Sequence, residues 1–274
     1  MRDRLNTQHY ILANFMGYEV LHPSISLTRN SALKVADVAT GTGIWLQRLS
    51  AVLSPLPGDQ SHYFHGFDIS DKQFPVDGDS ANKISFSIHD ATESFPEEHL
   101  NTYDLVHVRL LVLALPEPEI RIAMENIVQL LRPGGYIQWE DADWCHAGAD
   151  KEAPTIIESM NMIIEYSATA GFCMRISESI MDQGKRLGLE VLKQDDYNIL
   201  ERTENYSEAR LWIFQLLQAL LPVTFLRTRR AESESTARSL TCQTLQNVEL
   251  EYTHGVLPKF QTFAIVGKRP TDSL

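Results

Sequence analysis

Three short apolar stretches near the start of the chain are each associated with an aspartate at or near their carboxyl end. The stretches are residues 35–38, 63–67 and 84–89, and the aspartates are Asp37, Asp68 and Asp90. β-Branched and aromatic residues favour strands, and the carboxyl ends of parallel strands in an open α/β sheet form the crevice where ligands bind. The sequence therefore predicts that these three carboxylates gather along one ligand-binding edge.

A turn of small residues follows the first stretch. Residues 39–43 read Ala-Thr-Gly-Thr-Gly, and a helical apolar pattern begins at Ile44. Gly41 and Gly43 have no Cβ, so a ligand can lie directly against the backbone at the start of the helix. This segment is predicted to be a strand, a ligand-binding turn and a helix N-terminus.

The elements that must hold these residues alternate along the chain. Further strands are predicted at residues 103–108, 136–139, 188–192 and 258–268, and helices at 1–22, from 44 onward, and at 119–131, 154–188, 207–220 and 233–252. Strands that alternate with helices of this length pair in parallel through βαβ units. The late helical blocks break this alternation, so we expect them to form a cap over one end of the sheet.

Composition and charge narrow the classes of partner. The 274 residues, 43% hydrophobic and 22% charged, fit one large or two small globular domains. The net charge of −12 argues against a nucleic-acid or anionic-membrane surface, because such surfaces need clustered lysines and arginines. The one basic cluster, at residues 227–230, is too short to change this.

The cysteines and the apolar runs indicate in which cellular compartment the protein is expected. Cys145, Cys173 and Cys242 are far apart and form no CxxC pair, which fits a reducing compartment and neither a disulfide framework nor a zinc site. The N-terminus lacks the apolar segment of a signal peptide, and no run approaches the roughly 20 apolar residues that span a bilayer. We expect a cytoplasmic protein without a metal or a membrane partner.

Five motifs occur in a fixed order over residues 33–141. They are Asp37-x-Ala39-x-Gly41-x-Gly43, Phe67-Asp68-Ile69, His89-Asp90-Ala91, Tyr103-Asp104-Leu105-Val106-His107 and Leu131-Arg132-Pro133-Gly134-Gly135. The series resembles the class I S-adenosylmethionine (SAM) dependent methyltransferases. The resemblance implies an α/β, Rossmann-like, seven-stranded and mostly parallel sheet whose last strand is antiparallel.

A narrower resemblance rests on three segments. They are Arg4-Leu5-x-x-Gln8-His9, the turn at residues 41–45 and Asp104-Leu105-Val106-His107-x-Arg109. These are similar to the fungal secondary-metabolism methyltransferases, a group that also contains regulators of metabolite gene clusters.

Two departures from the family pattern concern the cofactor loop. Ala39 stands where the family usually has its first glycine, and a methyl group fits there if the backbone φ is negative. Asp68 follows Asp37 by 31 residues, more than the roughly 20 of the dinucleotide fingerprint. The loop at residues 54–59, rich in proline, is expected to account for the excess.

The resemblance implies SAM as cofactor and assigns its contacts. Asp68 would accept hydrogen bonds from the ribose hydroxyls and Asp90 would bind the adenine amino group, whereas each could instead cap a helix or turn. Asp37 would organise the loop and the SAM ammonium. The expected cofactor-binding residues are Tyr10, Asp37, Ala39, Thr40, Gly41, Gly43, Asp68, Ile69, Asp90, Ala91, His107 and Arg109.

Methyl transfer from a sulfonium requires alignment of the acceptor and, for a hydroxyl or thiol, removal of a proton. Candidate bases are His9, His107, Glu140, Asp141 and His146, of which His9, His107 and Glu140 are the expected catalytic residues. The alternative for each is a structural role in packing or capping. The residues expected to contact substrate are Tyr18, Asp141, Trp144, Phe172, Met174 and Phe214.

The whole chain, residues 1–274, is expected to form one methyltransferase domain. Residues 1–30 would form an N-terminal lid, residues 31–141 the SAM-binding core, and residues 142–187 with 203–252 a helical substrate cap.

The function expected from the sequence is methylation of a small-molecule natural product on O, N or S by a monomer or homodimer. The substrate would be a largely apolar molecule. Two alternatives remain: a SAM-binding protein that catalyses cyclisation or another non-methylating reaction, and a regulatory protein of the same fold.

Overall fold

The computed structural model describes residues 2–27, 31–53, 61–75, 83–201 and 203–271. Seven strands form one sheet in the order β3-β2-β1-β4-β5-β7-β6. Their bounds are β1 Lys34–Val38, β2 Tyr63–Asp68, β3 Ile84–Ile88, β4 Tyr103–Arg109, β5 Leu131–Ala149, β6 Glu190–Asn198 and β7 Pro258–Lys268. The loop at residues 54–59, expected to explain the spacing between Asp37 and Asp68, lies outside the described residues.

The pairing directions match the predicted fold class. β1 pairs in parallel with β2 and β4, and the parallel ladder continues from β2 to β3 and from β4 to β5. β7 runs antiparallel to both β5 and β6, between which it is inserted. The predicted Rossmann-like sheet with an antiparallel last strand is confirmed.

Helices α2 (Ile44–Val52), α3 (Glu117–Leu130) and α5 (Ile176–Arg186) pack along this sheet. α5 contacts α3, β5 and β6. The expectation that residues 142–187 all belong to the cap is therefore wrong for α5, which covers the sheet. It is also wrong for residues 142–149, because β5 continues to Ala149 through pairing with β7.

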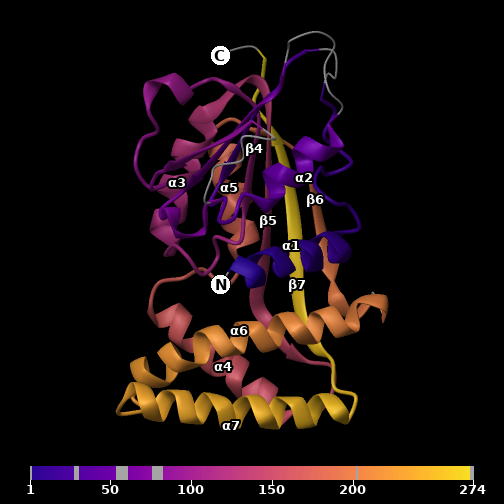
Figure 1. Cartoon of the computed structure of the whole chain (residues 1–274), viewed down its shortest axis with the longest axis vertical. Helices are drawn as coiled ribbons and strands as arrows, with labels where there is room; N and C mark the ends of the chain where they lie inside the picture. Colours follow the sequence, from indigo (N-terminus) through magenta and orange to yellow (C-terminus); the bar gives the residue numbers. More distant parts are fainter. Residues whose placement is uncertain (1, 28–30, 54–60, 76–82, 202, 272–274) are drawn as a thin grey trace.

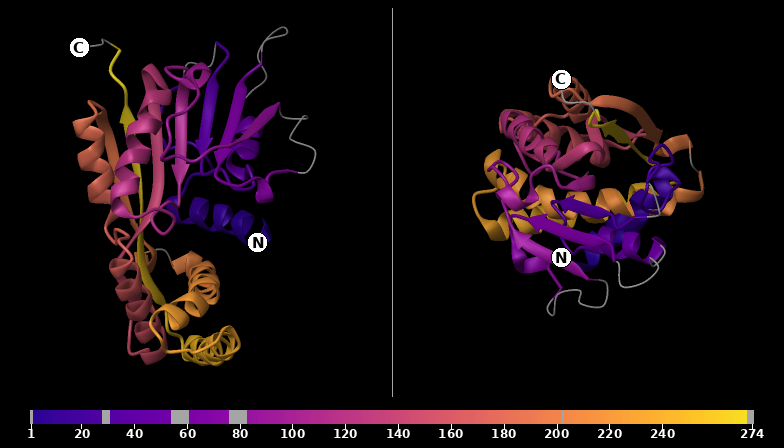
Figure 2. Two further views of the ribbon diagram at one scale, coloured as in Figure 1. Left: turned by 90° about the vertical axis from the view of Figure 1, so that its left-hand side faces the viewer. Right: turned by 90° about the horizontal axis from the view of Figure 1, so that it is seen from above.

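The cap consists of α4 (Pro154–Thr169), α6 (Tyr206–Arg227) and α7 (Glu234–Thr253), which pack against one another. Figure 1 shows these helices together at one end of the molecule, with β5 and β7 reaching down to them. Figure 2 shows α1 (Arg2–Met16) between the sheet and α6. One apolar cluster continues from the sheet through α1 into the cap, and it includes Leu12, Phe15 and Trp212.

Several elements differ in length from their predicted ranges. α1 ends at Met16 rather than at residue 22, because Gly17 adopts a left-handed φ of 78°. The predicted helix at 154–188 divides into α4 and α5 at Gly171, whose φ is 88°. Short 3-10 turns complete the structure: η1 Asp71–Gln73, η2 Glu97–His99, η3 Ile199–Glu201 and η4 Thr203–Asn205.

α6 meets the length and composition criteria for a membrane-crossing helix, which corrects the expectation that no stretch is apolar enough. In the structure α6 packs against α1, α4 and α7. These contacts cover part of the apolar surface of α6 within the cap.

Candidate functional site

The turn after β1 has a left-handed backbone at three positions. Gly41 and Gly43 have φ of 56° and 74°, and the amide of Gly43 donates to the carbonyl of Thr40 at 2.9 Å. Ala39 has φ of 59°. The expectation of a negative φ at Ala39 is therefore wrong, and its methyl group occupies a left-handed conformation that disfavours L side chains.

Ala39→Gly is expected to raise the free energy of unfolding by up to about 1 kcal/mol. Glycine removes roughly 1–2 kcal/mol of left-handed strain, and its more flexible unfolded chain costs about 0.4–1 kcal/mol. Urea denaturation measures the difference. The matched control is Ala36→Gly in the buried interior of β1, which is expected to lose about 0.5–1 kcal/mol. Equal losses in both variants would contradict the strain at Ala39.

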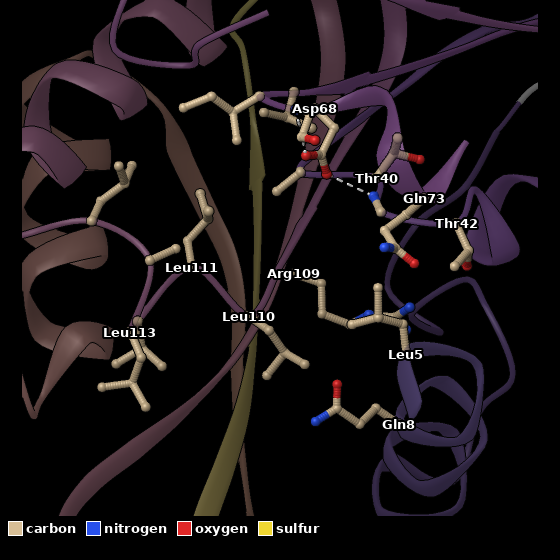
Figure 3. A pocket seen from close by; sticks show the side chains of 18 of the residues that line it. Leu5, Gln8, Thr40, Thr42, Asp68, Gln73, Arg109, Leu110, Leu111 and Leu113 are labelled. Atoms are coloured by element: carbon tan, nitrogen blue, oxygen red, sulfur yellow. Dashed lines mark hydrogen bonds between the residues drawn. The ribbon is translucent and has the colours of Figure 1, made fainter. Parts of the chain in front are cut away.

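Asp68 and Asp90 lie at the ends of neighbouring strands and face one cavity. The carboxylate of Asp68 accepts the Gly41 amide at 2.8 Å, which joins β2 to the glycine turn (Figure 3). Burial raises the pKa of Asp68. Asp90 Oδ1 accepts the amide and the hydroxyl of Thr92, and these bonds lower its pKa. The turn role considered for Asp90 is thus present, and Asp90 also lines the cavity.

The cavity has a volume of about 560 Å³, within the usual range for small-molecule sites. One side is formed by the glycine turn with the ends of β2 and β3. The other side is apolar and comes from residues 110–115 and from α6. α1 closes the cavity through Leu5, Gln8 and His9. Figure 3 shows Leu5 and Gln8 of α1 on the opposite side of this space from Leu111 and Leu113, with Arg109 reaching towards α1.

A side-chain hydrogen bond joins α1 to the glycine turn. Thr42 donates its hydroxyl to Asn6 at 2.6 Å, and a Cβ added at Gly41 would lie 3.3 Å from Leu5. The N-terminal helix thus rests directly on the loop predicted to bind the cofactor.

Strand register brings three buried ionisable residues together behind the cavity. Asp37 of β1 pairs with His107 of β4, and Arg109 of β4 pairs with Glu140 of β5. Asp37 accepts from His107 Nδ1 at 2.7 Å and from the Thr40 hydroxyl at 2.6 Å. His107 Nε2 lies 3.4 Å from Glu140. Asp37 uses both carboxylate oxygens in these contacts and does not line the cavity.

Contacts within this cluster favour the charged forms of His107 and Glu140. Burial alone would lower the pKa of His107, but Asp37 and Glu140 raise it above its ordinary value. Burial would raise the pKa of Glu140, yet the hydrogen bond from His107 lowers it. The imidazole of His107 also stacks on Trp45 of α2, with ring centroids 3.8 Å apart. A protonated imidazole held between two carboxylates is the stable state of this arrangement.

His9 and Arg109 join α1 to the end of β4. Arg109 Nη1 donates to His9 Nδ1 at 3.0 Å, so His9 Nε2 carries the ring proton. Burial and the adjacent guanidinium lower the pKa of His9 to about 3. His9 is therefore a neutral ring at pH 7 whose accepting nitrogen is already occupied, which argues against its expected role as a base.

Stability is expected to fall as the pH drops from about 6.5 towards 3, with a contribution from His9 of up to about 1.4 kcal/mol per pH unit. In this interval the unfolded chain protonates His9 at its ordinary pKa of 6.5, whereas the folded chain does not until about 3. His9→Gln should flatten the acid limb of the stability curve. The comparison variant is His254→Gln, which removes an exposed histidine after α7. Identical slopes for wild type and His9→Gln would contradict the neutral state of His9.

Asp141 shapes the apolar side of the cavity without reaching it. Its carboxylate accepts the amides of Leu111 and Val112 at 2.8 and 3.2 Å and the indole N–H of Trp139 at 3.3 Å. Burial raises its pKa to about 7. These bonds hold the segment after β4, where Leu110 has a left-handed φ of 57°. Asp141 therefore positions the wall and does not itself line the cavity.

The structure gathers half of the sequence-predicted residues around the cavity. Those that line it are His9, Ala39, Thr40, Gly41, Asp68, Ile69, Asp90, Ala91, Arg109 and Trp144. Those that do not are Tyr10, Tyr18, Asp37, Gly43, His107, Glu140, Asp141, Phe172, Met174 and Phe214. The side chain of His146 lies outside the described part of the chain.

Local contacts explain why several of the predicted residues do not line the cavity. The Tyr18 hydroxyl donates to Glu140 at 2.9 Å, and Tyr10 is 47% exposed. Phe214 lies two positions from Trp212 on α6, about 200° around the helix, so it turns away from the cavity. Met174 and Phe172 belong to the turn between α4 and α5, where the Met174 carbonyl accepts the Trp144 amide. Gly43 packs against Phe86.

Several lining residues were missed from sequence. They are Arg4, Leu5, Gln8, Lys72, Gln73, residues 110–115, Leu216, Ala219 and Leu220. Two signals could have found the apolar ones. Residues 110–115 form an apolar run directly after a strand end, and residues 212, 216, 219 and 220 share one helix face.

The comparisons agree with this geometry. Residues 35–135 match the methyltransferase domain model Methyltransf_25. Methyltransferase grgD of a Penicillium species is 42% identical over 144 residues, covering 52% of this chain and 49% of that protein. N-methyltransferase gliN of Aspergillus fumigatus is 28% identical over 167 residues, covering 60% and 56%. The chain thus spans about half the length of the curated relatives it matches.

Two solved structures share the fold at low sequence identity. The [4+2]-cyclase SpnF has a TM-score of 0.54 at 17% identity, covering 97% of this chain and 82% of that one. Haemonchus contortus phosphoethanolamine N-methyltransferase 2 in complex with SAM has a TM-score of 0.51 at 14% identity, covering 97% and 57%. Residues 35–135 thus match a methyltransferase domain, the chain shares the fold of these two solved structures, and about half of it is similar to fungal methyltransferases.

Proposed function

We propose that this chain is a SAM-dependent methyltransferase that methylates a small, largely apolar natural product in secondary metabolism. The observation that carries the proposal is the two-sided cavity. Asp68, Asp90 and the glycine turn meet on one side, and residues 110–115 face α6 on the other. SAM supplies the activated methyl group, and the chain's own residues align the two molecules and exclude water.

The polar side suits the cofactor. Asp68 would accept from the ribose hydroxyls, Ile69 would lie on the adenine, and Asp90 would take the adenine amino group. Arg4 and Gln8 of α1 would cover the cofactor. α1 would act as a lid, because it rests on the glycine turn through Thr42.

The apolar side suits the substrate. Trp144 of β5 with Trp212, Leu216 and Leu220 of α6 form a wall with few polar groups. Helix α6, which α4 and α7 support, would therefore set the choice of substrate, and α1 the closure over it. We further propose a cytoplasmic monomer or homodimer. The three cysteines, all free in the structure, support a reducing compartment.

Asp68→Ala is expected to weaken SAM binding by roughly 1–3 kcal/mol, because it removes the carboxylate that accepts from the ribose. Isothermal calorimetry measures the affinity. The control is Asp71→Ala, which removes an exposed carboxylate from the adjoining 3-10 turn and should leave the affinity unchanged. Unchanged binding in Asp68→Ala would overturn the cofactor assignment.

Methyl-labelled SAM then distinguishes methyl transfer from the other reactions of this fold. We expect label in the product. A converted but unlabelled product would instead establish a non-methylating enzyme that retains the same cofactor site.

A further inference from the structure

One cation stands at the boundary between the two sides of the cavity. Arg109 projects from the end of β4, its side chain is 13% exposed, and it lines the cavity. Figure 3 shows it between Asp68 and Thr40 on one side and Leu110 and Gln8 on the other. Its nearest carboxylate is Glu140 at 3.9 Å, and its hydrogen-bond partner His9 is a neutral ring. Among the described residues, the positive charge of this largely buried guanidinium therefore has only one carboxylate near it, and that carboxylate is not in hydrogen-bond contact.

The apolar side of the cavity offers no ready base among its described residues. They are residues 110–115, Trp144, Trp212, Leu216, Ala219 and Leu220, with Gln8, His9 and Arg109 at the boundary. His9 is the one Brønsted base among them, and its accepting nitrogen is taken by Arg109. The carboxylates Asp68 and Asp90 and the ring of His89 lie on the polar side, where they contact the Gly41 amide, Thr92 and the Glu93 carbonyl. An acceptor held on the apolar side that must lose a proton would find no free base among the described residues of that side.

We propose that the acceptor is the carboxylate of a largely apolar organic acid, held by Arg109. This inference rests on the proposed function and names the substrate class of the same site. A carboxylic acid is already ionised at neutral pH, so it needs no base. Arginine recognises carboxylates through paired N–H donors, and an anion between the guanidinium and the sulfonium of SAM is favoured by both charges.

The chemical step balances without a proton transfer. A carboxylate oxygen attacks the methyl carbon of SAM, the new O–C bond forms as the C–S bond breaks, and the bonding pair passes to sulfur. The products are a methyl ester and neutral S-adenosylhomocysteine. Because the negative charge disappears during the step, Arg109 stabilises the bound acid more than the transition state. Loss of Arg109 should therefore raise KM and leave kcat unchanged or higher.

The body of the acid would lie against the apolar wall. Trp212, Leu216, Ala219 and Leu220 follow one face of α6 and stand opposite the segment at 110–115. Both surfaces are aliphatic or aromatic, so the affinity for the body comes from burial of its apolar area. The charge at one end and the apolar wall together select an amphipathic acid.

Matched probes test the inference on the full chain. The acids are 1-naphthoic, 4-phenylbutyric and decanoic acid, and each is paired with its neutral primary amide. Calorimetry measures their binding to protein saturated with S-adenosylhomocysteine, and labelled SAM reports ester formation. At least one acid is expected to bind ten-fold or more tightly than its amide and to yield its methyl ester. Arg109→Gln should abolish this preference, whereas Arg109→Lys should retain part of it.

The outcomes separate this inference from the proposed function. S-Adenosylhomocysteine should bind Arg109→Gln within about two-fold of wild type. Loss of that binding would place Arg109 with the cofactor, as the sequence suggested, and would overturn the inference. Label transferred to an amide or amine, or no acid that binds better than its amide, would overturn it while leaving the methyltransferase proposal intact. Failure of wild type to bind S-adenosylhomocysteine would overturn the proposed function itself.

Discussion

Replacement of Glu140 with leucine is expected to lower the free energy of unfolding by about 3–5 kcal/mol. Glu140 is a buried anion that lies 3.4 Å from His107 and accepts from Gln138 and Tyr18 at 2.6 and 2.9 Å. Leucine would leave the buried imidazolium with one partner fewer and would remove an acceptor from Gln138 and from Tyr18. Removal of one member of a buried charge pair typically has a cost of this size.

A surface ion pair provides the matched comparison. Glu158 contacts Arg230 at 3.2 Å, and the two side chains are 73% and 50% exposed. Glu158→Leu is expected to cost less than about 1 kcal/mol, because exposed pairs are screened by water. Urea unfolding of both variants checks the contrast. Similar losses would mean that Asp37, His107 and Glu140 do not form the charged cluster described above.

Gly43→Ala is expected to lower the free energy of unfolding by about 2–5 kcal/mol and to impair SAM binding. Gly43 has φ of 74°, and an added Cβ would lie 2.6 Å from the ring of Phe86. The left-handed backbone costs a non-glycine residue roughly 1–2 kcal/mol, and overpacking adds about 1–3 kcal/mol. The turn must shift to relieve the contact, and it carries the backbone predicted to bind the cofactor.

Two further glycines separate these causes. Gly188 has φ of 79° but open space where a Cβ would go, and Gly148 has open space without a left-handed φ. Gly188→Ala is expected to cost only the conformational part, and Gly148→Ala almost nothing. In the Gly43→Ala protein, Phe86→Leu should recover part of the loss. If all three single variants were equally stable, the close approach of Phe86 would not constrain the turn.

The strands and the polar side of the site could be predicted because their signals are local. An apolar run that ends in aspartate places Asp68 and Asp90 at the sheet edge regardless of the rest of the chain. The glycine turn is similarly encoded within five residues. Lining of the cavity by Gly41, Asp68 and Asp90 agrees with that local logic.

The role of the central acidic and basic residues could not be predicted, because it depends on strand register. Asp37, His107 and Glu140 are distant in sequence, and pairing turns them towards one another behind the cavity. The sequence predicts a catalytic role for Glu140, although its side chain does not line the cavity. The prediction that Phe214 contacts the substrate has a related weakness. The orientation of α6 decides which of its apolar faces meets the cavity.

The long antiparallel ladder of β5 and β7 has a consequence for how this architecture diversifies. The ladder runs from the pair Tyr136 and Lys268 in the sheet to Ala149 and Pro258 beside the cap. The cap helices are connected to this strand pair. Helix α4 follows β5, and α6 with α7 precede β7. Exchange of α6 would have to preserve its contact with α1, which rests on the glycine turn after β1. Transplantation of residues 203–257 between related proteins is expected to change which substrates are accepted. The glycine turn and the ends of β2 and β3 would keep their sequence.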